Sequence, residues 1–275
     1  MPSLFYLKMI MNKCFKIIVF LGLAAAMLCS CAQKDTEIWY TSTDGQTVDV
    51  QPGMAQRVVS NKYRNGRGVI ELSEPLVIVD DIAFTEATTL KSIILPKSVR
   101  RIGNQTFYKC YSLESAVLPE GLEEIWSSAF CHCDSLKEIN IPSTVTRLGQ
   151  EAFGVTPSLK NAVVPQSVTV LEKAVFSGSG IESIEIPDGI TSIEAFAFVK
   201  CPNLKAIKLP FSLETIDYAA FGECTSLTEI DIPQSCKSID DMAFYACWAL
   251  KTARVPEGCE IGENAFPEGC EIVRY

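Results

Sequence analysis

The sequence predicts an α/β solenoid of about nine repeats of 22–23 residues, with a parallel β-sheet on one face and short helical turns or loops on the other. Three observations predict it. Phenylalanine recurs every 22 or 23 residues, at Phe84, Phe107, Phe130, Phe153, Phe176, Phe198, Phe221, Phe244 and Phe266. A Leu or Ile lies five or six residues after each of the first eight of these repeat phenylalanines. A proline lies eleven or twelve residues after each of the same eight.

One unit, residues 135–157, illustrates the elements expected in each repeat. Residues 137–141 alternate polar and apolar side chains, which predicts a half-buried strand. Pro142 lacks an N–H donor and ends that strand. A returning segment buries two aliphatic residues, and a short helical turn is expected at 152–153. Each unit leaves an apolar face that only a neighbour can cover, so nine stacked units should form a rod of roughly 40 Å.

The regular period covers residues 68–275, with a degenerate first unit beginning near Gly68. Residues 31–67 lie outside it, and we interpret them as a tether followed by an N-terminal cap. Arg64-Asn65-Gly66 between two apolar runs predicts a hairpin turn. The last residues, from Cys270 to Tyr275, should supply a final strand.

Residues 1–30 have the features of a signal peptide. Lys13 and Lys16 precede an apolar stretch at 17–28 that is shorter than the ~20 residues needed to span a bilayer. Translation could start at Met1, Met9 or Met11. The end of the segment, Leu-Cys-Ser-Cys, resembles the lipobox of bacterial lipoproteins, which implies lipidation at Cys31. The following residues resemble short tethers that direct lipoproteins to the outer leaflet of the outer membrane. We therefore expect surface display, with the inner face of that membrane as the alternative.

The charge of the chain argues against nucleic acid as a partner. Removal of residues 1–30 takes away three lysines and no acid, which leaves 21 basic against 33 acidic residues, a net charge of −12. The sequence has no basic run that could track a phosphate backbone. We expect contact with a membrane through the lipid anchor only.

The repeat resembles the BspA-like class of leucine-rich repeat, A-F-x-x-C-x-x-L-x-x-I-x-[IL]-P-x-x-[VL]-x-x-I-G. Several units depart from it: alanine replaces the strand isoleucine at 116, 162 and 253, and Thr156 and Ser179 replace the cysteine. The resemblance implies a leucine-rich-repeat solenoid at the cell surface that mediates adhesion or protein–protein interaction. It does not name a ligand.

Most of the twelve cysteines follow the repeat. Five lie three residues after a repeat phenylalanine, and two replace the Val or Leu after the proline: Cys110, Cys133, Cys201, Cys224 and Cys247, then Cys236 and Cys259. Because free cysteine packs as a small buried hydrophobe, we expect buried thiols here rather than disulfides. The disulfide status of Cys131 and Cys270 stays open.

The segment Cys131-His132-Cys133 invites a metal site or a Cys–His nucleophile. His132 is the only histidine, however, and Cys131 and His132 are adjacent on a turn, so their side chains should diverge. We expect both residues at exposed, variable positions. No catalytic residue, metal site or cofactor is predicted, and an enzymatic function is disfavoured.

Two surfaces are candidates for partner binding. The outward column of the sheet should form an ion-pair ladder in its C-terminal half, from Glu185 to Arg254, and its N-terminal half is apolar at Ile94, Val117 and Val163. These β-branched residues either suit a sheet surface or floor a binding patch.

Aromatic residues form the second surface. Trp126 stands in a column otherwise filled by glycine and acids, so it should be exposed, and Tyr108, Tyr111, Tyr245 and Trp248 form two further clusters. Each ring either covers a neighbouring turn or acts as an interaction hot spot. In the second case Trp126→Ala should weaken partner binding without unfolding the chain.

With the role that the resemblance implies, we expect a binding protein that uses these surfaces to recognise a surface or matrix protein of a host or neighbouring cell. The alternative is a glycan-binding accessory protein of a nutrient-uptake system, which would favour the aromatic clusters over the apolar column.

Overall fold

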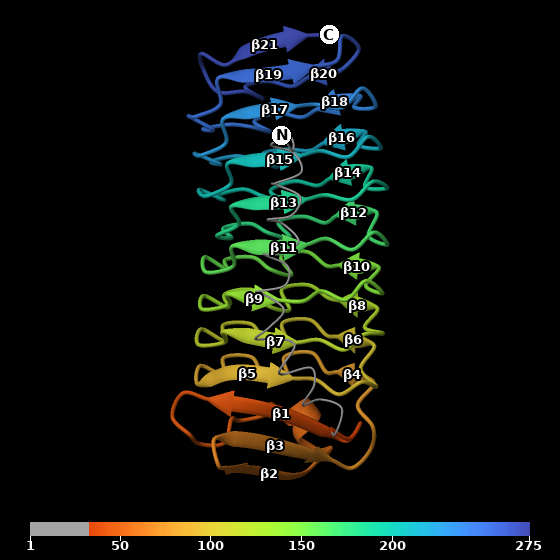
Figure 1. The fold of residues 1–275 in the computed structure, drawn as a ribbon, viewed down its shortest axis with the longest axis vertical. Helices are drawn as coiled ribbons and strands as arrows, with labels where there is room; N and C mark the ends of the chain where they lie inside the picture. The colour runs from red at the N-terminus through yellow and green to blue at the C-terminus, as the bar shows by residue number, and fades with distance from the viewer. Residues whose placement is uncertain (1–32) are drawn as a thin grey trace, which may run out of the picture.

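The computed structural model describes residues 33–275, which form a β-solenoid of about nine coils. Figure 1 shows two columns of strands running the length of the rod. The long column consists of β5 (Leu90–Ile94), β7 (Ser115–Val117), β9 (Glu138–Ile139), β11 (Asn161–Val163), β13 (Ser183–Glu185), β15 (Ala206–Lys208), β17 (Glu229–Asp231), β19 (Thr252–Val255) and β21 (Glu271–Arg274). The short column consists of β4 (Ile78–Val79), β6 (Arg101–Ile102), β8 (Glu124–Ile125), β10 (Arg147–Leu148), β12 (Val170–Leu171), β14 (Ser192–Ile193), β16 (Thr215–Ile216), β18 (Ser238–Ile239) and β20 (Glu260–Ile261).

Neighbouring strands within each column are parallel and keep the repeat register, as predicted for the long column. The short column was not predicted, because its two-residue strands leave too little alternation to detect. Neither column is one unbroken sheet. The long column is divided between β9 and β11 and again between β15 and β17, and the short column is divided between β10 and β12.

The predicted helical turns are wrong, so the α/β class is not confirmed. In the described residues the α-helix is confined to α2 (Pro52–Ala55), outside the repeats. The repeat turns contain residues in the left-handed region, such as Gln105 at φ 52° and Lys109 at φ 57°, which interrupt an α-helix. The N–H groups of Gln105, Phe107 and Lys109 instead donate to carbonyls of the next coil at 2.8–2.9 Å. The turns therefore form a third ladder between coils.

The core lies between the two columns and the turns. The repeat phenylalanines stack from coil to coil, with ring centroids 5.0–5.6 Å apart. All of them from Phe84 to Phe244 are at most 1% exposed. The seven repeat cysteines are buried, as predicted, and each carries an unbonded thiol in this structure. The five that follow a repeat phenylalanine each place Sγ 3.0–3.2 Å from the carbonyl of the preceding coil's phenylalanine.

Three antiparallel strands form the N-terminal end of the rod: β1 (Glu37–Ser42), β2 (Val58–Arg64) and β3 (Arg67–Leu72). The predicted hairpin joins β2 to β3 through Asn65 and Gly66, both at positive φ. β1 lies between β3 and β5 and is antiparallel to both. The expected first unit is therefore split: β4 enters the short column directly, but β1 separates β3 from the long column.

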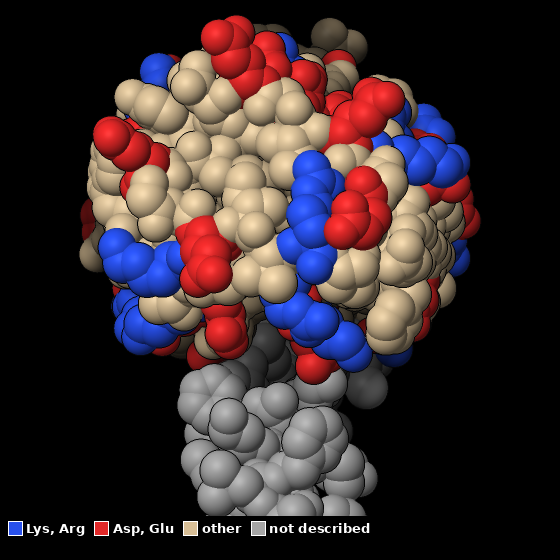
Figure 2. Space-filling model, turned by 90° about the horizontal axis from the view of Figure 1, so that it is seen from above, with Lys and Arg blue, Asp and Glu red and all other residues tan. Residues whose placement is uncertain are grey.

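The C-terminal end carries the predicted last strand, β21, which pairs parallel with β19. All four residues of β21 are exposed. Figure 2 looks down on this end, where charged side chains surround an uncharged middle. No helix in residues 33–275 is long and apolar enough to cross a membrane. The predicted signal peptide and Cys31 lie outside the described residues.

Candidate interaction surfaces

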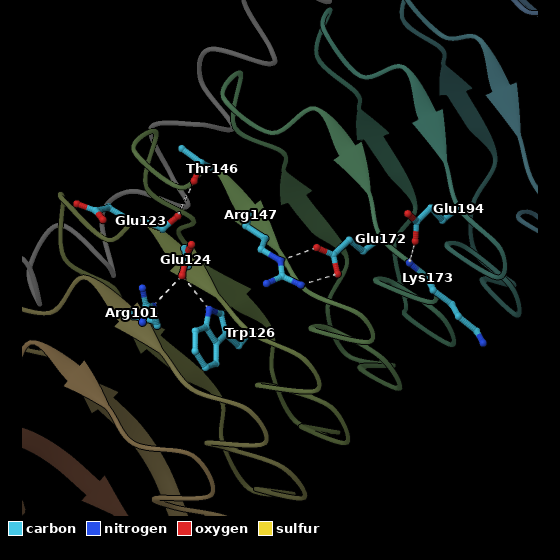
Figure 3. A network of polar contacts seen from close by, with 9 residues as sticks. All are labelled: Arg101, Glu123, Glu124, Trp126, Thr146, Arg147, Glu172, Lys173 and Glu194. Carbon is cyan, nitrogen blue, oxygen red and sulfur yellow. Dashed lines mark hydrogen bonds and ion pairs between the residues drawn. The ribbon is translucent and has the colours of Figure 1, made fainter.

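Trp126 follows β8 and is only half-buried rather than fully exposed, which corrects the prediction. Its Nε1–H donates to Glu124 Oε2 at 2.8 Å. The Arg101 guanidinium lies 4.7 Å from its ring centroid and also donates to Glu124 at 2.7 Å. Figure 3 shows Glu124 between these two partners. The hydrogen bond from Trp126, together with the charge of Arg101, holds the pKa of Glu124 below its ordinary value despite partial burial.

The same network continues along the short column (Figure 3). Arg147 donates to both carboxylate oxygens of Glu172, at 2.7 and 3.3 Å, and the backbone N–H of Lys173 donates to Glu194 at 2.8 Å. Acids that the sequence placed in the column of Trp126 are thus paired with cations or backbone donors of neighbouring coils. Around Trp126 itself, both Arg101 and Glu124 are engaged in contacts within the protein.

The apolar half of the long column is less exposed than predicted. Ile94 is half-buried and Val117 is 7% exposed, whereas Val163 is 58% exposed. Ile94 lies beside Val117 in the parallel pair β5–β7, and Trp39 of β1 lies on its other side. The sequence could not show that β1 adds an apolar neighbour here. Of the three predicted residues, Val163 remains the one that offers an exposed apolar side chain.

The predicted ion-pair ladder is largely absent among the described residues. Arg254 pairs with Asp231, with 3.7 Å between the charged groups. Glu185 lies opposite Lys208 in the register, but no ion pair joins them. Lys208 instead lies 5.8 Å from the ring centroid of Phe211. In place of a continuous ladder there is one ion pair, Asp231–Arg254, and one cation–aromatic contact, Lys208–Phe211.

Phe211 is a candidate that the sequence reasoning missed. It is 75% exposed, the highest value among the large apolar side chains of the described residues. A signal existed, because the residue after the repeat proline is polar in every other coil from Lys97 to Glu257. A phenylalanine in a polar column is what an interaction surface would require.

In the first aromatic cluster one ring packs within the molecule and the other is exposed. Tyr108 is half-buried, packs its ring edge-to-face on His132 at 5.8 Å and receives the Lys109 ammonium at 5.2 Å. Tyr111 is 40% exposed. Cys131 is 5% exposed, so its predicted exposure is wrong, and burial raises its pKa to about 11.

His132 is partly exposed and adopts φ 60°, in a turn column where left-handed residues recur. Its imidazole is 4.0 Å from the Asp134 carboxylate. In residues 33–275 no group of three or more His, Cys, Asp or Glu side chains is arranged to hold a metal ion. The residues of the Cys-His-Cys segment are therefore accounted for by the turn that contains them.

The second aromatic cluster is open to solvent. Tyr245 is 45% exposed and Trp248 is 60% exposed. They lie three residues apart on the turn that follows Phe244, so one partner could contact both rings. Exposed aromatic side chains of this size supply much of the binding energy at protein interfaces.

A shallow hollow of about 330 Å³ lies on the outward face of the β2–β3 hairpin. Its lining includes three cations, Lys62, Arg64 and Arg67, and one acid, Glu71. Arg67 is also engaged, with its guanidinium 4.4 Å from the Trp39 ring. At the edge of the hollow Ser60 Oγ donates to Glu71 Oε2 at 2.8 Å, so this acid is already paired within the hairpin.

Comparison with known proteins places the fold. The family model described as the BspA type leucine rich repeat region matches residues 67–182 and 171–275, with six copies. A crystal structure of a leucine-rich repeat protein from Bacteroides ovatus is 23% identical, with a TM-score of 0.59 over 84% of this chain. This chain spans 64% of the length of that protein. The leucine-rich repeat protein of T. pallidum is 29% identical over 65% of this chain and 73% of its own, with a TM-score of 0.46. No curated protein sequence matches the chain.

Proposed function

Because the chain belongs to the BspA-type leucine-rich repeat family, we propose that it is a non-enzymatic binding protein of the bacterial cell surface. It would attach to a surface or matrix protein of a host or neighbouring cell. The exposed pair Tyr245 and Trp248 is the observation that carries this proposal. A solenoid gains nothing in stability from leaving two large rings in water, whereas a partner would bury them.

The membrane part of the proposal depends on residues before the described structure. We propose lipidation at Cys31 and display on the outer face of the outer membrane, with the fold beginning close to the anchor. Gln33 is already held, because its side-chain amide donates to the carbonyls of Glu37 and Ile94 at 2.8 and 2.9 Å. Cys31→Ser should abolish incorporation of labelled fatty acid. Protease digestion of intact cells would distinguish the outer from the inner face.

The binding test compares the mature chain on immobilised extracellular matrix proteins and on a glycan array. We expect saturable binding to a protein, and we expect Trp248→Ala to lower the affinity at least tenfold, as truncation of a hot-spot aromatic does. Val59→Ser is the matched control, because Val59 is 67% exposed on the cap, far along the chain from the aromatic pair. Equal binding by wild type and Trp248→Ala would contradict the proposed contact.

Glycan binding is the second candidate, and the exposure of the Trp248 ring favours it as well, since a flat aromatic face can stack on a sugar. In this case the array would show selective glycan binding that Trp248→Ala removes, while the matrix proteins would not bind. The protein would then be a glycan-capturing accessory of a nutrient-uptake system.

A further inference from the structure

Cys236 and Cys259 occupy a column that is aliphatic in the preceding coils. The position three residues after the repeat proline is Val99, Leu122, Val145, Val168, Ile190 and Leu213 before it becomes cysteine in two consecutive coils. The other repeat cysteines belong to a different column, where cysteine is the usual residue. In this column aliphatic side chains are therefore replaced by thiols only near the C-terminal end.

The two thiols face each other in the core. Cys236 Sγ and Cys259 Sγ are 3.9 Å apart, and the residues are 3% and 4% exposed. Each stands just before a strand of the directly paired strands β18 and β20. Adjacent coils lie about 4.8 Å apart, which is within the range of Cα separations that a disulfide spans.

The hydrogen bonds of these thiols differ from those of the other repeat cysteines. The five thiols that follow a repeat phenylalanine donate to a carbonyl oxygen of the preceding coil at 3.0–3.2 Å. Cys236 and Cys259 lie farther from their nearest backbone oxygens, 3.5 and 3.6 Å, and the Cys259 thiol is directed at Cys236. A sulfur–sulfur bond would thus displace only weak contacts.

We propose that Cys236 and Cys259 are oxidised to a disulfide that ties the last two coils of the described solenoid together. The oxidant is the disulfide of another molecule, either oxidised glutathione or the active-site disulfide of a thiol oxidase. One cysteine, as its thiolate, breaks the oxidant's S–S bond and forms a mixed disulfide, and the second cysteine then displaces the oxidant's remaining sulfur. The protein loses two electrons and two protons, and the oxidant leaves as two thiols.

Burial sets when this reaction can occur. Burial and the neighbouring thiol raise the pKa of Cys236 to about 12, so the thiolate is scarce in the folded protein. The bond should form while the C-terminal coils are still open and then remain protected. In the cell this requires export to an oxidising compartment, which belongs to the proposed function.

The test uses the mature chain, refolded in a glutathione redox buffer, then denatured, alkylated and digested with trypsin. We expect residues 209–237 and 255–274 to be recovered as one linked species that reduction separates, with fragmentation placing the bond at Cys236 and Cys259. Full alkylation of both residues would overturn the proposal. So would a bond placed at Cys224 or Cys270, which lie on the same peptides.

The matched variant restores the column's ordinary residues, Cys236→Leu with Cys259→Val, and should fold without the link. Reduction should lower the unfolding midpoint of the wild type by roughly 5 °C and leave this variant unchanged. A control with Cys201→Ala should keep both the link and the shift. If the bond forms in buffer but protein isolated from cells carries free thiols, the proposed export is wrong while the disulfide chemistry stands.

Discussion

The two halves of the solenoid share their inner columns but use their aromatic side chains differently. In the N-terminal half the tripeptide Glu-Ile-Trp occurs twice, at 37–39 and 124–126, and in both copies the indole donates to the glutamate while an arginine packs on the ring. In the C-terminal half Phe211, Tyr245 and Trp248 are 45–75% exposed. The two N-terminal tryptophans are thus engaged within the protein, whereas these three C-terminal rings face solvent.

The largest expected effect tests whether the inner columns are equivalent. Phe107→Ala and Phe221→Ala should each lower the free energy of unfolding by about 3–5 kcal/mol, because both rings are fully buried and stacked on both sides. Denaturant titration of the two variants checks this. If only one of the two variants lost stability, the core would be packed differently in the two halves of the rod.

The next prediction separates the two tryptophans. Trp126→Ala should lower the free energy of unfolding by about 1–3 kcal/mol, because Glu124 loses a donor and Arg101 loses the ring beneath it. Trp248→Ala should change it by less than about 0.5 kcal/mol, as expected for an exposed side chain. The measurement is equilibrium unfolding under one set of conditions. Similar losses in the two variants would mean that Trp248 is structural too.

The smallest effect concerns one carboxylate. Trp126→Phe removes the hydrogen bond that contributes most to the low pKa of Glu124, so this pKa should rise toward its ordinary value. Because the folded-state pKa lies below the unfolded one, the stabilisation is present above the unfolded pKa and is lost as the pH falls through the folded pKa. NMR titration of the Glu124 carboxyl group follows the change. Trp248→Phe, the control, should leave the Glu124 titration unaltered.

The repeat period predicted the inner columns, the long strands and the burial of the repeat cysteines, because each follows from one residue type recurring at one spacing. It could not predict the turns, where backbone torsions alone separate a helix from a left-handed residue such as Lys109. Nor could it place β1, whose antiparallel pairing with β3 and β5 joins segments outside the period. Ile94 was misjudged because Trp39 of β1 lies beside it, and Trp126 was misjudged because Arg101 and Glu124 engage its ring.

The candidate site was predictable to a smaller extent. Tyr245 and Trp248 were identified and are exposed, whereas Phe211 was overlooked although its column is otherwise polar. Trp126 broke the pattern of its column in the same way, but its partners, Arg101 one coil earlier and Glu124 two residues before, satisfy it. A departure from a column therefore identifies a residue of interest, and only the structure shows whether the protein itself already uses it.

The ladder formed by the turns has a consequence for the history of the gene. Each coil offers its neighbours the same backbone donors and acceptors, so the turn of one coil can dock on that of any other. If unequal recombination deleted or duplicated one complete repeat, the backbone N–H and C=O groups of the turns at the junction would still find hydrogen-bond partners. The length of the rod can thus change in whole steps, each shifting the exposed aromatic residues by one coil relative to the N-terminal end.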